Sequence, residues 1–299
     1  MEVLFHNVRE LVERAEQENK LISEIMIEQE MAMSERSRED IFAQMERNLE
    51  VMSQAVDRGL KGVTSVTGLT GGDAVLIQNY LKSGKGLSGD FLLDAVSKAV
   101  ATNEVNAAMG MICATPTAGS AGVVPGVLFS VKNKLNPTHE QMVRFLFTAG
   151  AFGFVVANNA SISGAAGGCQ AEVGSAAAMA AASIVEMAGG TPQQSAHAFS
   201  ISLKNMLGLV CDPVAGLVEV PCVKRNAMGA ANAMVAADMA LAGVESRIPT
   251  DEVIDAMYRI GQTMPSALRE TAQGGLAATP TGRWLEKRIF GGAVANSGN

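Results

Sequence analysis

Apolar side chains recur every three or four positions along most of this chain, which is the period of an α-helix with one buried face. Near the N-terminus, residues 4–15 follow this period and residues 21–26 continue it. The Ser-Arg-Glu-Asp segment at 37–40 has the form of a capping box and opens a further helix that ends near Gly59. We therefore expect residues 1–60 to form a helical arm that packs on the rest of the protein or on a neighbour.

Beyond a Gly/Ser/Thr-rich stretch at 61–90, the chain alternates between Ala-rich helices and loops of small residues. The predicted helices cover 91–111, 141–156, 171–188, 193–208, 223–243 and 250–262. The loops cover 113–126, 158–174, 211–221 and 273–282. The sequence contains no alternating run that predicts a strand. We expect an all-α fold in which residues 61–299 form a helical domain, continuous with the arm, whose Gly-rich loops converge on one site.

Composition and charge narrow the range of possible folds and partners. Aromatic residues make up only 4% of the chain, while 31 Gly and 17 Met suit closely packed helices. Residues 1–57 hold 14 acidic and 6 basic side chains, and no basic stripe follows, so we expect no nucleic-acid partner.

The same sequence argues against a membrane and against export. The longest apolar stretches, 145–157 and 176–185, are shorter than the ~20 residues that span a bilayer. The N-terminus lacks the basic region and apolar core of a secretory signal. Four cysteines in a chain of this length are no disulfide scaffold, so we expect a cytoplasmic protein.

Three cysteines stand in Gly-rich or Pro-rich surroundings. Cys169 follows a Gly-Gly pair, and Cys211 and Cys222 bracket a loop that prolines interrupt. Their spacing fits neither a zinc knuckle nor a ferredoxin, and a buried structural role is the simple alternative. Three thiolates can nevertheless hold three corners of a cubane iron–sulfur cluster, which leaves the fourth iron open as a Lewis acid.

Two loops could bind a small anion through hydroxyl groups and free backbone amides, although ordinary helix capping explains them equally well. The candidate ligands are Thr115, Thr117, Ser120, Asn159, Ser161 and Ser163. Glu172, three residues after Cys169, is a candidate proton acceptor. The segment Lys224-Arg225-Asn226, which follows Cys222, could place positive charge beside an anionic substrate, with Lys224 as the candidate catalytic residue. Solvated or ion-paired roles remain open for both.

At these segments the chain resembles the α subunit of the iron–sulfur-dependent L-serine dehydratases. The matching stretches are 67–73, 114–125, 159–174, 205–226 and 269–277. The resemblance implies an all-helical catalytic domain with a [4Fe-4S] cluster held by Cys169, Cys211 and Cys222. It also implies that L-serine is converted to pyruvate and ammonia. Cys113 lies outside that ligand pattern, so we expect a structural or substrate-adjacent role for it.

The chain departs from the family's single-chain members, which carry a β domain with a Ser-Ser-His-Thr motif. That motif is missing here, so we expect a separate β subunit as partner, with one of its histidines as the base or, within this chain, Glu172 or Lys224. Some members end in a cysteine that binds the fourth iron. This chain ends Asn-Ser-Gly-Asn at 296–299, so we expect no such ligand.

Two other functions stay open. The chain could be a non-catalytic subunit with a structural metal, in which case it would hold zinc without labile sulfide. It could also be a pyridoxal-phosphate lyase with a Schiff base on a lysine such as Lys204, although nothing around the lysines favours this.

Overall fold

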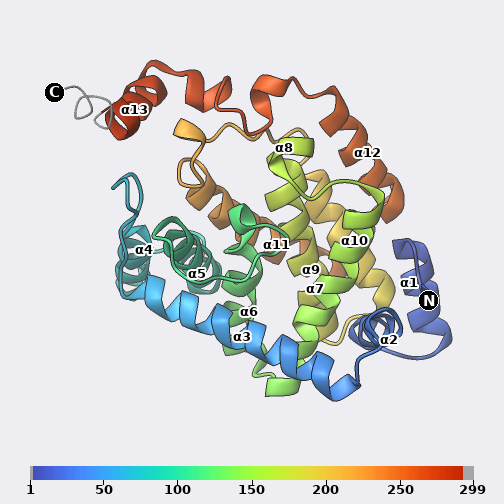
Figure 1. Cartoon of the computed structure of the whole chain (residues 1–299). Helices are drawn as coiled ribbons and strands as arrows, with labels where there is room; N and C mark the ends of the chain where they lie inside the picture. Colours follow the sequence, from blue (N-terminus) through green and yellow to red (C-terminus); the bar gives the residue numbers. More distant parts are fainter. Residues whose placement is uncertain (1–2, 292–299) are drawn as a thin grey trace.

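The structure is a computed structural model that describes residues 3–291 (Figure 1). Within that range the chain forms helices and short helical turns with two isolated β-bridges, so the all-α prediction is confirmed. The α-helices are α1 (Val8–Gln17), α2 (Ile22–Ser34), α3 (Arg38–Leu60), α4 (Asp73–Lys82), α5 (Asp90–Ala107), α6 (Val123–Leu135), α7 (His139–Asn159), α8 (Gly164–Gly167), α9 (Ser175–Met187), α10 (Pro192–Lys204), α11 (Cys222–Leu241), α12 (Thr250–Thr263) and α13 (Pro280–Phe290). The shorter turns are η1 (Ala118–Ser120), η2 (Gln170–Gly174), η3 (Val214–Gly216), η4 (Ser266–Leu268) and η5 (Gly275–Ala278).

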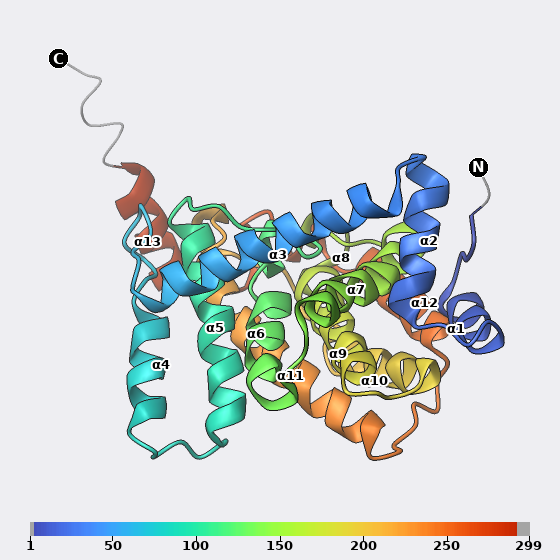
Figure 2. The same cartoon turned by 90° about the horizontal axis from the view of Figure 1, so that it is seen from below.

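Helix α9 lies at the centre of the fold. Every residue from Ser175 to Val185 is buried, and α9 packs against α6, α7, α10 and α11 (Figures 1 and 2). Most of these buried residues are alanines, whose single methyl group lets neighbouring helix backbones approach closely. A helix that is apolar on all sides is expected at the core of a large domain.

Helix α5 makes two close crossings that depend on glycine. A Cβ atom built on Gly59 of α3 would meet the backbone carbonyl of Ala101 in α5. A Cβ atom on Gly126 of α6 would lie 2.6 Å from the backbone nitrogen of Ala99. Since no side chain fits at either crossing, these glycines fix how α3 and α6 pack on α5.

The N-terminal helices share the core of the rest of the molecule. Phe5 is buried with its ring edge-on to Phe154 of α7, at 5.5 Å between centroids. The carboxylate of Asp251 in α12 accepts hydrogen bonds from the backbone N–H groups of Val8 and Arg9 at 2.8 and 3.0 Å. The arm therefore packs on the rest of the chain, while the division at residue 60 stays a prediction.

Four helices were not predicted from the sequence: α4, α6, α13 and the single turn α8, which lies within the predicted loop 158–174. Helix α6 reads as a mainly apolar run interrupted by Pro125 and Gly126, and it is buried over most of its length, so it lacks an amphipathic period. Helices α4 and α13 follow Gly-rich segments that resemble loops, and each begins directly after its turn, at Asp73 and at Pro280. The other predicted helices are present, with ends shifted by a few residues.

Among the described helices, His139–Asn159 (α7) alone is long and apolar enough to cross a membrane by length and composition. Of its most apolar window, 61% is buried inside the protein. This burial is typical of a helix in a protein core.

Candidate functional site

The segment that carries Cys169 is bent by glycine. Helix α8 ends at Gly168, whose φ of 78° lies in the left-handed region, and Cys169 then precedes the π-turn η2 and α9. The next residue, Gln170, is buried and forms two hydrogen bonds to the turn before Cys211. Its backbone N–H donates to the Leu209 carbonyl at 3.0 Å, and its side-chain Oε1 accepts from the Gly208 N–H at 2.9 Å. These bonds attach the Cys169 segment to the chain leading to Cys211.

Cys211 and Cys222 are held by different partners. The backbone of Cys211 pairs with the segment before η5, because its N–H donates to the Leu268 carbonyl at 2.8 Å and its carbonyl accepts from the Glu270 N–H at 2.7 Å. Cys222 is the first residue of α11. Its carbonyl accepts from the buried amide of Asn226 at 2.9 Å, and that amide also donates to the Gly119 carbonyl at 2.7 Å. Hydrogen bonds to backbone groups therefore hold the segments of all three cysteines in place.

The three thiols lie close to one another and are buried. Burial raises the pKa of Cys169 to about 11 and that of Cys222 to about 12. The pKa of Cys211 is also raised, first by burial and then by the nearby negative charges of Glu172, Cys169 and other groups that include Cys222. The negative charge of a thiolate at one of these positions would raise the pKa of its neighbours, so the three cysteines lie within electrostatic range of one another.

Glu172 lies among these thiols. Its carboxylate accepts a hydrogen bond from the Thr117 hydroxyl at 2.7 Å, and its Oε2 is 3.9 Å from the sulfur of Cys211. Burial raises the pKa of Glu172, an effect that the Thr117 hydrogen bond opposes. The carboxylate therefore connects the 113–122 loop to the cysteines.

Arg225 was overlooked as a separate candidate. Its side chain is only 14% exposed; one guanidinium nitrogen is 2.9 Å from Asp212 Oδ1, and another donates to the Val210 carbonyl at 2.8 Å. Its positive charge lowers the pKa of Cys169, against the larger opposite effect of burial. Asp212 in turn accepts from the Leu276 N–H at 2.7 Å. The Arg225–Asp212 pair thus joins α11, the Cys211 loop and η5 beside Cys169.

These residues fit an iron–sulfur cluster. All three cysteines carry free thiols, and thiolates are the ligands that such clusters use. Within residues 3–291, no group of three or more His, Cys, Asp or Glu side chains converges on a point as the ligands of a single ion do. A cubane is larger than one ion and each thiolate binds a different iron, so its cysteines surround a volume. A Cβ on Gly164 would lie 2.7 Å from both Cys211 Sγ and Glu172 Oε2, so a side chain at this position would press on a cysteine and on the carboxylate beside it.

The 113–122 loop contains hydroxyl groups with different roles. Ser120 is buried and donates to the Thr115 carbonyl at 2.9 Å, so it shapes the loop. The hydroxyl of Thr117 is bonded to Glu172. The Thr115 hydroxyl is buried and has no hydrogen-bond partner within the described residues, which leaves it free for a ligand. Cys113 is half-buried, and its thiol donates to the Asn48 carbonyl at 3.4 Å.

Other predicted ligands have partners of their own. The amide of Asn159 donates to the His6 carbonyl at 2.6 Å, which ties α7 to the N-terminal segment. Ser163 caps α8 by accepting from the Ala166 N–H at 3.2 Å, and Ser161 accepts from the Ser163 N–H at 3.3 Å. Their roles in substrate binding stay predictions without a supporting contact.

The two candidate lysines are also engaged elsewhere. Lys224 is 61% exposed and pairs with Asp73 at the start of α4. The ammonium group of Lys204 donates to the Ser246 hydroxyl at 2.9 Å. Neither contact involves the cysteine loops. A cavity of about 550 Å³ between α1, α10 and the start of α12 is lined by none of the three cysteines.

The sequence model of the family described as "Serine dehydratase alpha chain" matches residues 17–277, a range that includes all three cysteine segments. The chain belongs to the serine dehydratase alpha chain family. It is 78% identical over 293 residues to a probable L-serine dehydratase, alpha chain, of Bacillus subtilis (strain 168), with 98% of each chain covered. It is 43% identical over 286 residues to the L-serine dehydratase, alpha chain, of Peptoniphilus asaccharolyticus, covering 95% of this chain and 98% of that one.

A further member of the serine dehydratase relatives is longer. The L-serine dehydratase of Escherichia coli (strain K12) is 39% identical over 280 residues, and the match covers 91% of this chain but 61% of that protein. The longer relative therefore has a large part with no counterpart in this chain. The prediction that no terminal cysteine binds the fourth iron concerns residues 296–299, which lie outside the described residues.

Proposed function

We propose that this chain is the cluster-binding α subunit of an L-serine dehydratase, a lyase that converts L-serine to pyruvate and ammonia. The observation that carries the proposal is the grouping of three buried, free thiols around a buried carboxylate. Relatives that cover nearly the whole chain and are named as L-serine dehydratase alpha chains support the same reaction.

Cys169, Cys211 and Cys222 would hold a [4Fe-4S] cluster. When bound, the cluster would supply an iron with an open coordination position, which acts as a Lewis acid on the serine hydroxyl. Arg225 would offset part of the negative charge of the Cys169 thiolate, because its guanidinium is held in place by Asp212 and the Val210 carbonyl. A charged group that is already in position needs no reorganisation during the reaction.

The 113–122 loop would orient the substrate. The Thr115 hydroxyl is buried and has no hydrogen-bond partner among residues 3–291, and a polar group left in this way gains most from a ligand that satisfies it. Thr117 holds the carboxylate of Glu172 in one position through its hydrogen bond. Because the site is buried, a bound serine would lose water, and each polar contact to it would strengthen.

Elimination of water requires removal of the Cα proton of serine. The leading candidate for the base is a histidine of the β subunit, and Glu172 is the candidate within this chain. Glu172 supports this alternative by its place beside the cysteines, with one oxygen bonded to Thr117 and the other 3.9 Å from the sulfur of Cys211. Loss of water then gives aminoacrylate, which tautomerises to an imine and hydrolyses to pyruvate and ammonia.

We further propose that the active enzyme contains a separate β subunit and works in the reducing cytoplasm. The longer single-chain relative, of which this chain spans 61%, supports a second component. The free thiols suit a reducing compartment, since oxidation would remove cluster ligands.

The test is anaerobic purification of the chain, alone and with the β chain, followed by measurement of iron, acid-labile sulfide and pyruvate release from L-serine. We expect iron and sulfide in equal amounts, and pyruvate release that is lost in air and restored by ferrous iron and a reductant. Zinc without sulfide, with no pyruvate from either preparation, would favour a non-catalytic subunit instead. A borohydride-sensitive absorbance would favour a pyridoxal-phosphate lyase.

The two candidate bases can be separated. If β supplies the base, the cluster-loaded α chain alone should exchange the Cα proton of serine with deuterated water much more slowly than the complex. If Glu172 is the base, exchange should persist in the α chain alone and disappear in Glu172→Gln with its iron content unchanged.

A further inference from the structure

Helix α13 gains little burial from its own chain. Of its eleven residues only Gly282 is buried, while Trp284 is 57% and Phe290 is 50% exposed. The helix packs on the short turns η3 and η5 and projects from the body of the molecule (Figures 1 and 2). A helix of this length is marginal in water by itself, so its exposed face is suited to a partner.

Further exposed apolar side chains lie on segments that adjoin α13 or the cysteine loops (Figures 1 and 2). Leu276 is 42% exposed, and its N–H bonds Asp212, next to Cys211. Val66 is 82% exposed and precedes Thr67, whose hydroxyl bonds the buried Glu219 near Cys222.

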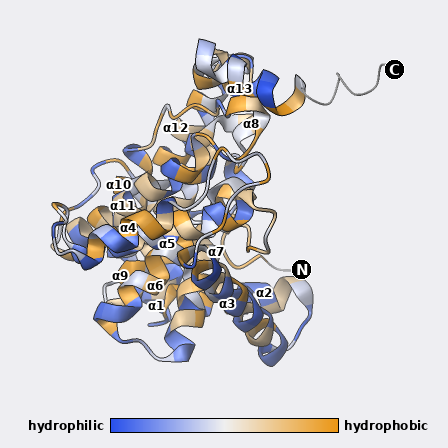
Figure 3. Ribbon diagram, turned by 90° about the vertical axis from the view of Figure 1, so that its left-hand side faces the viewer, coloured by the Kyte–Doolittle hydropathy of each residue, from blue (hydrophilic) through white to orange (hydrophobic). Residues whose placement is uncertain are grey.

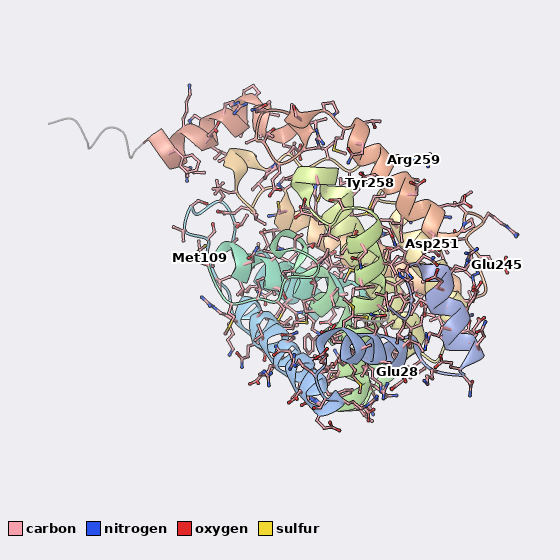
Figure 4. All side chains as sticks on the ribbon, turned by 45° about the vertical axis from the view of Figure 1, so that its right-hand side comes forward. Glu28, Met109, Glu245, Asp251, Tyr258 and Arg259 are labelled. Carbon is pink, nitrogen blue, oxygen red and sulfur yellow. The ribbon has the colours of Figure 1, made fainter. Side chains whose placement is uncertain are left out.

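Met109 and Met111 are 83% and 68% exposed and precede the loop that holds Glu172. Figure 4 labels Met109 on the side of the molecule that carries α13. We call the set of six the α13 rim: Val66, Met109, Met111, Leu276, Trp284 and Phe290.

The rim has a distinct charge. Helix α13 carries three basic side chains, Arg283, Lys287 and Arg288, against the single acid Glu286. Figure 3 shows hydrophobic and strongly hydrophilic positions side by side on this helix. Two more basic side chains are exposed nearby. Lys61 precedes Val66 by five residues, and the guanidinium of Arg58 lies beside Gly110, the residue after Met109. A matching partner surface would combine apolar side chains with acidic ones.

We propose that the α13 rim is the docking surface for the β subunit, which would cover the mouth of the cysteine site with an apolar, acidic surface. This inference rests on the proposed function. The occupant is argued from the longer single-chain relative, which has a part that this chain lacks, and from the position of the rim beside the cysteine loops. Docking there would place the partner over the loops that carry Cys211 and Cys222.

The test is co-purification and binding of the β chain by variants of the rim. Trp284→Glu and Met109→Glu place a negative charge in the centre and at the edge of the rim. We expect each to weaken β binding tenfold or more, because a buried tryptophan is a frequent interface hot spot. The matched control is Leu87→Glu, since Leu87 is 99% exposed in the α4–α5 loop, away from α13 in Figure 2.

The melting temperature and the iron and sulfide content of the isolated variants should equal those of the unchanged chain, because the substituted side chains are exposed. Unchanged β binding by both rim variants would overturn the inference, and so would equal weakening by Leu87→Glu. A dimer of the α chain that Trp284→Glu dissociates, with β binding intact, would assign the rim to a second copy and overturn it as well.

Failure of this inference is distinguishable from failure of the proposed function. If the complex of Trp284→Glu forms normally and releases pyruvate, only the docking surface is wrong. If the unchanged α chain and β chain associate but contain no iron–sulfur cluster and release no pyruvate, the proposed function is wrong whatever the rim binds.

Discussion

Replacement of Arg225 by methionine tests the claim that the Arg225–Asp212 pair joins the cysteine segments. Methionine has a similar length but cannot pair with Asp212 or donate to the Val210 carbonyl. Asp212 is only 5% exposed, so its carboxylate would stay buried with the Leu276 N–H as its remaining bond. Breaking a buried ion pair on one side costs about 3–5 kcal/mol in free energy of unfolding.

This cost should be visible in thermal unfolding of the metal-free protein, where loss of a cluster does not contribute. In a domain of this size, 1 kcal/mol shifts the melting temperature by about 2 °C, so we expect Arg225→Met to melt about 6–10 °C lower. The double variant Arg225→Met with Asp212→Asn should melt higher than Arg225→Met alone, because the unpaired charge is gone. A single variant within about 2 °C of the unchanged protein, or a double variant that melts lower than the single one, would refute the reasoning.

Three further predictions concern other sites. The pKa of Glu24 is lowered to about 2, first by its hydrogen bond to Arg38, so the stabilisation of the folded state by this carboxylate is complete above pH 4.5. Glu24→Gln should lower the free energy of unfolding by about 1–3 kcal/mol at pH 7, and this difference should shrink in urea titrations carried out down to pH 3. A difference that stays constant with pH would contradict this. Gly164→Ala should reduce the iron bound per chain, because its Cβ would press on Cys211 and Glu172, while Gly150→Ala, whose Cβ meets nothing within 4 Å, should retain the iron and melt slightly higher. Equal iron in both variants would contradict the role of Gly164. Thr117→Val should lower pyruvate release about tenfold or more at unchanged iron content, since it removes a hydrogen bond to the buried carboxylate of Glu172. Full activity would contradict the role of Thr117 in holding that carboxylate.

The fold could be predicted where helices are amphipathic and not where they are buried throughout. Helix α12 has polar and apolar residues on separate faces and was placed to within a residue of its ends, whereas α6 was missed. The grouping of Cys169, Cys211 and Cys222 came from the resemblance to the family, because their spacing and their Gly-rich or Pro-rich surroundings left a buried structural role open. The sequence could not indicate bonds between distant segments, such as that from Gln170 to the Gly208 backbone.

Helical geometry explains why Arg225 lies at the site and its neighbour Lys224 does not. Residues three and four positions apart share a helix face, so Arg225 and Asn226 follow Cys222 on the side of the site, whereas Lys224 points to Asp73. Counting positions from Cys222 along the predicted helix would have found this. The hydroxyl groups of Ser161 and Ser163 illustrate the opposite limit, since nothing in the sequence separates a helix cap from a substrate ligand.

The most direct test of the central claim is the iron and acid-labile sulfide content of anaerobically prepared cysteine variants. We predict that Cys169→Ser, Cys211→Ser and Cys222→Ser each lose most of both, and that Cys113→Ser keeps the content of the unchanged chain, because its thiol bonds the Asn48 carbonyl. Full iron and sulfide in any one of the first three variants, or their loss in Cys113→Ser, would contradict the account.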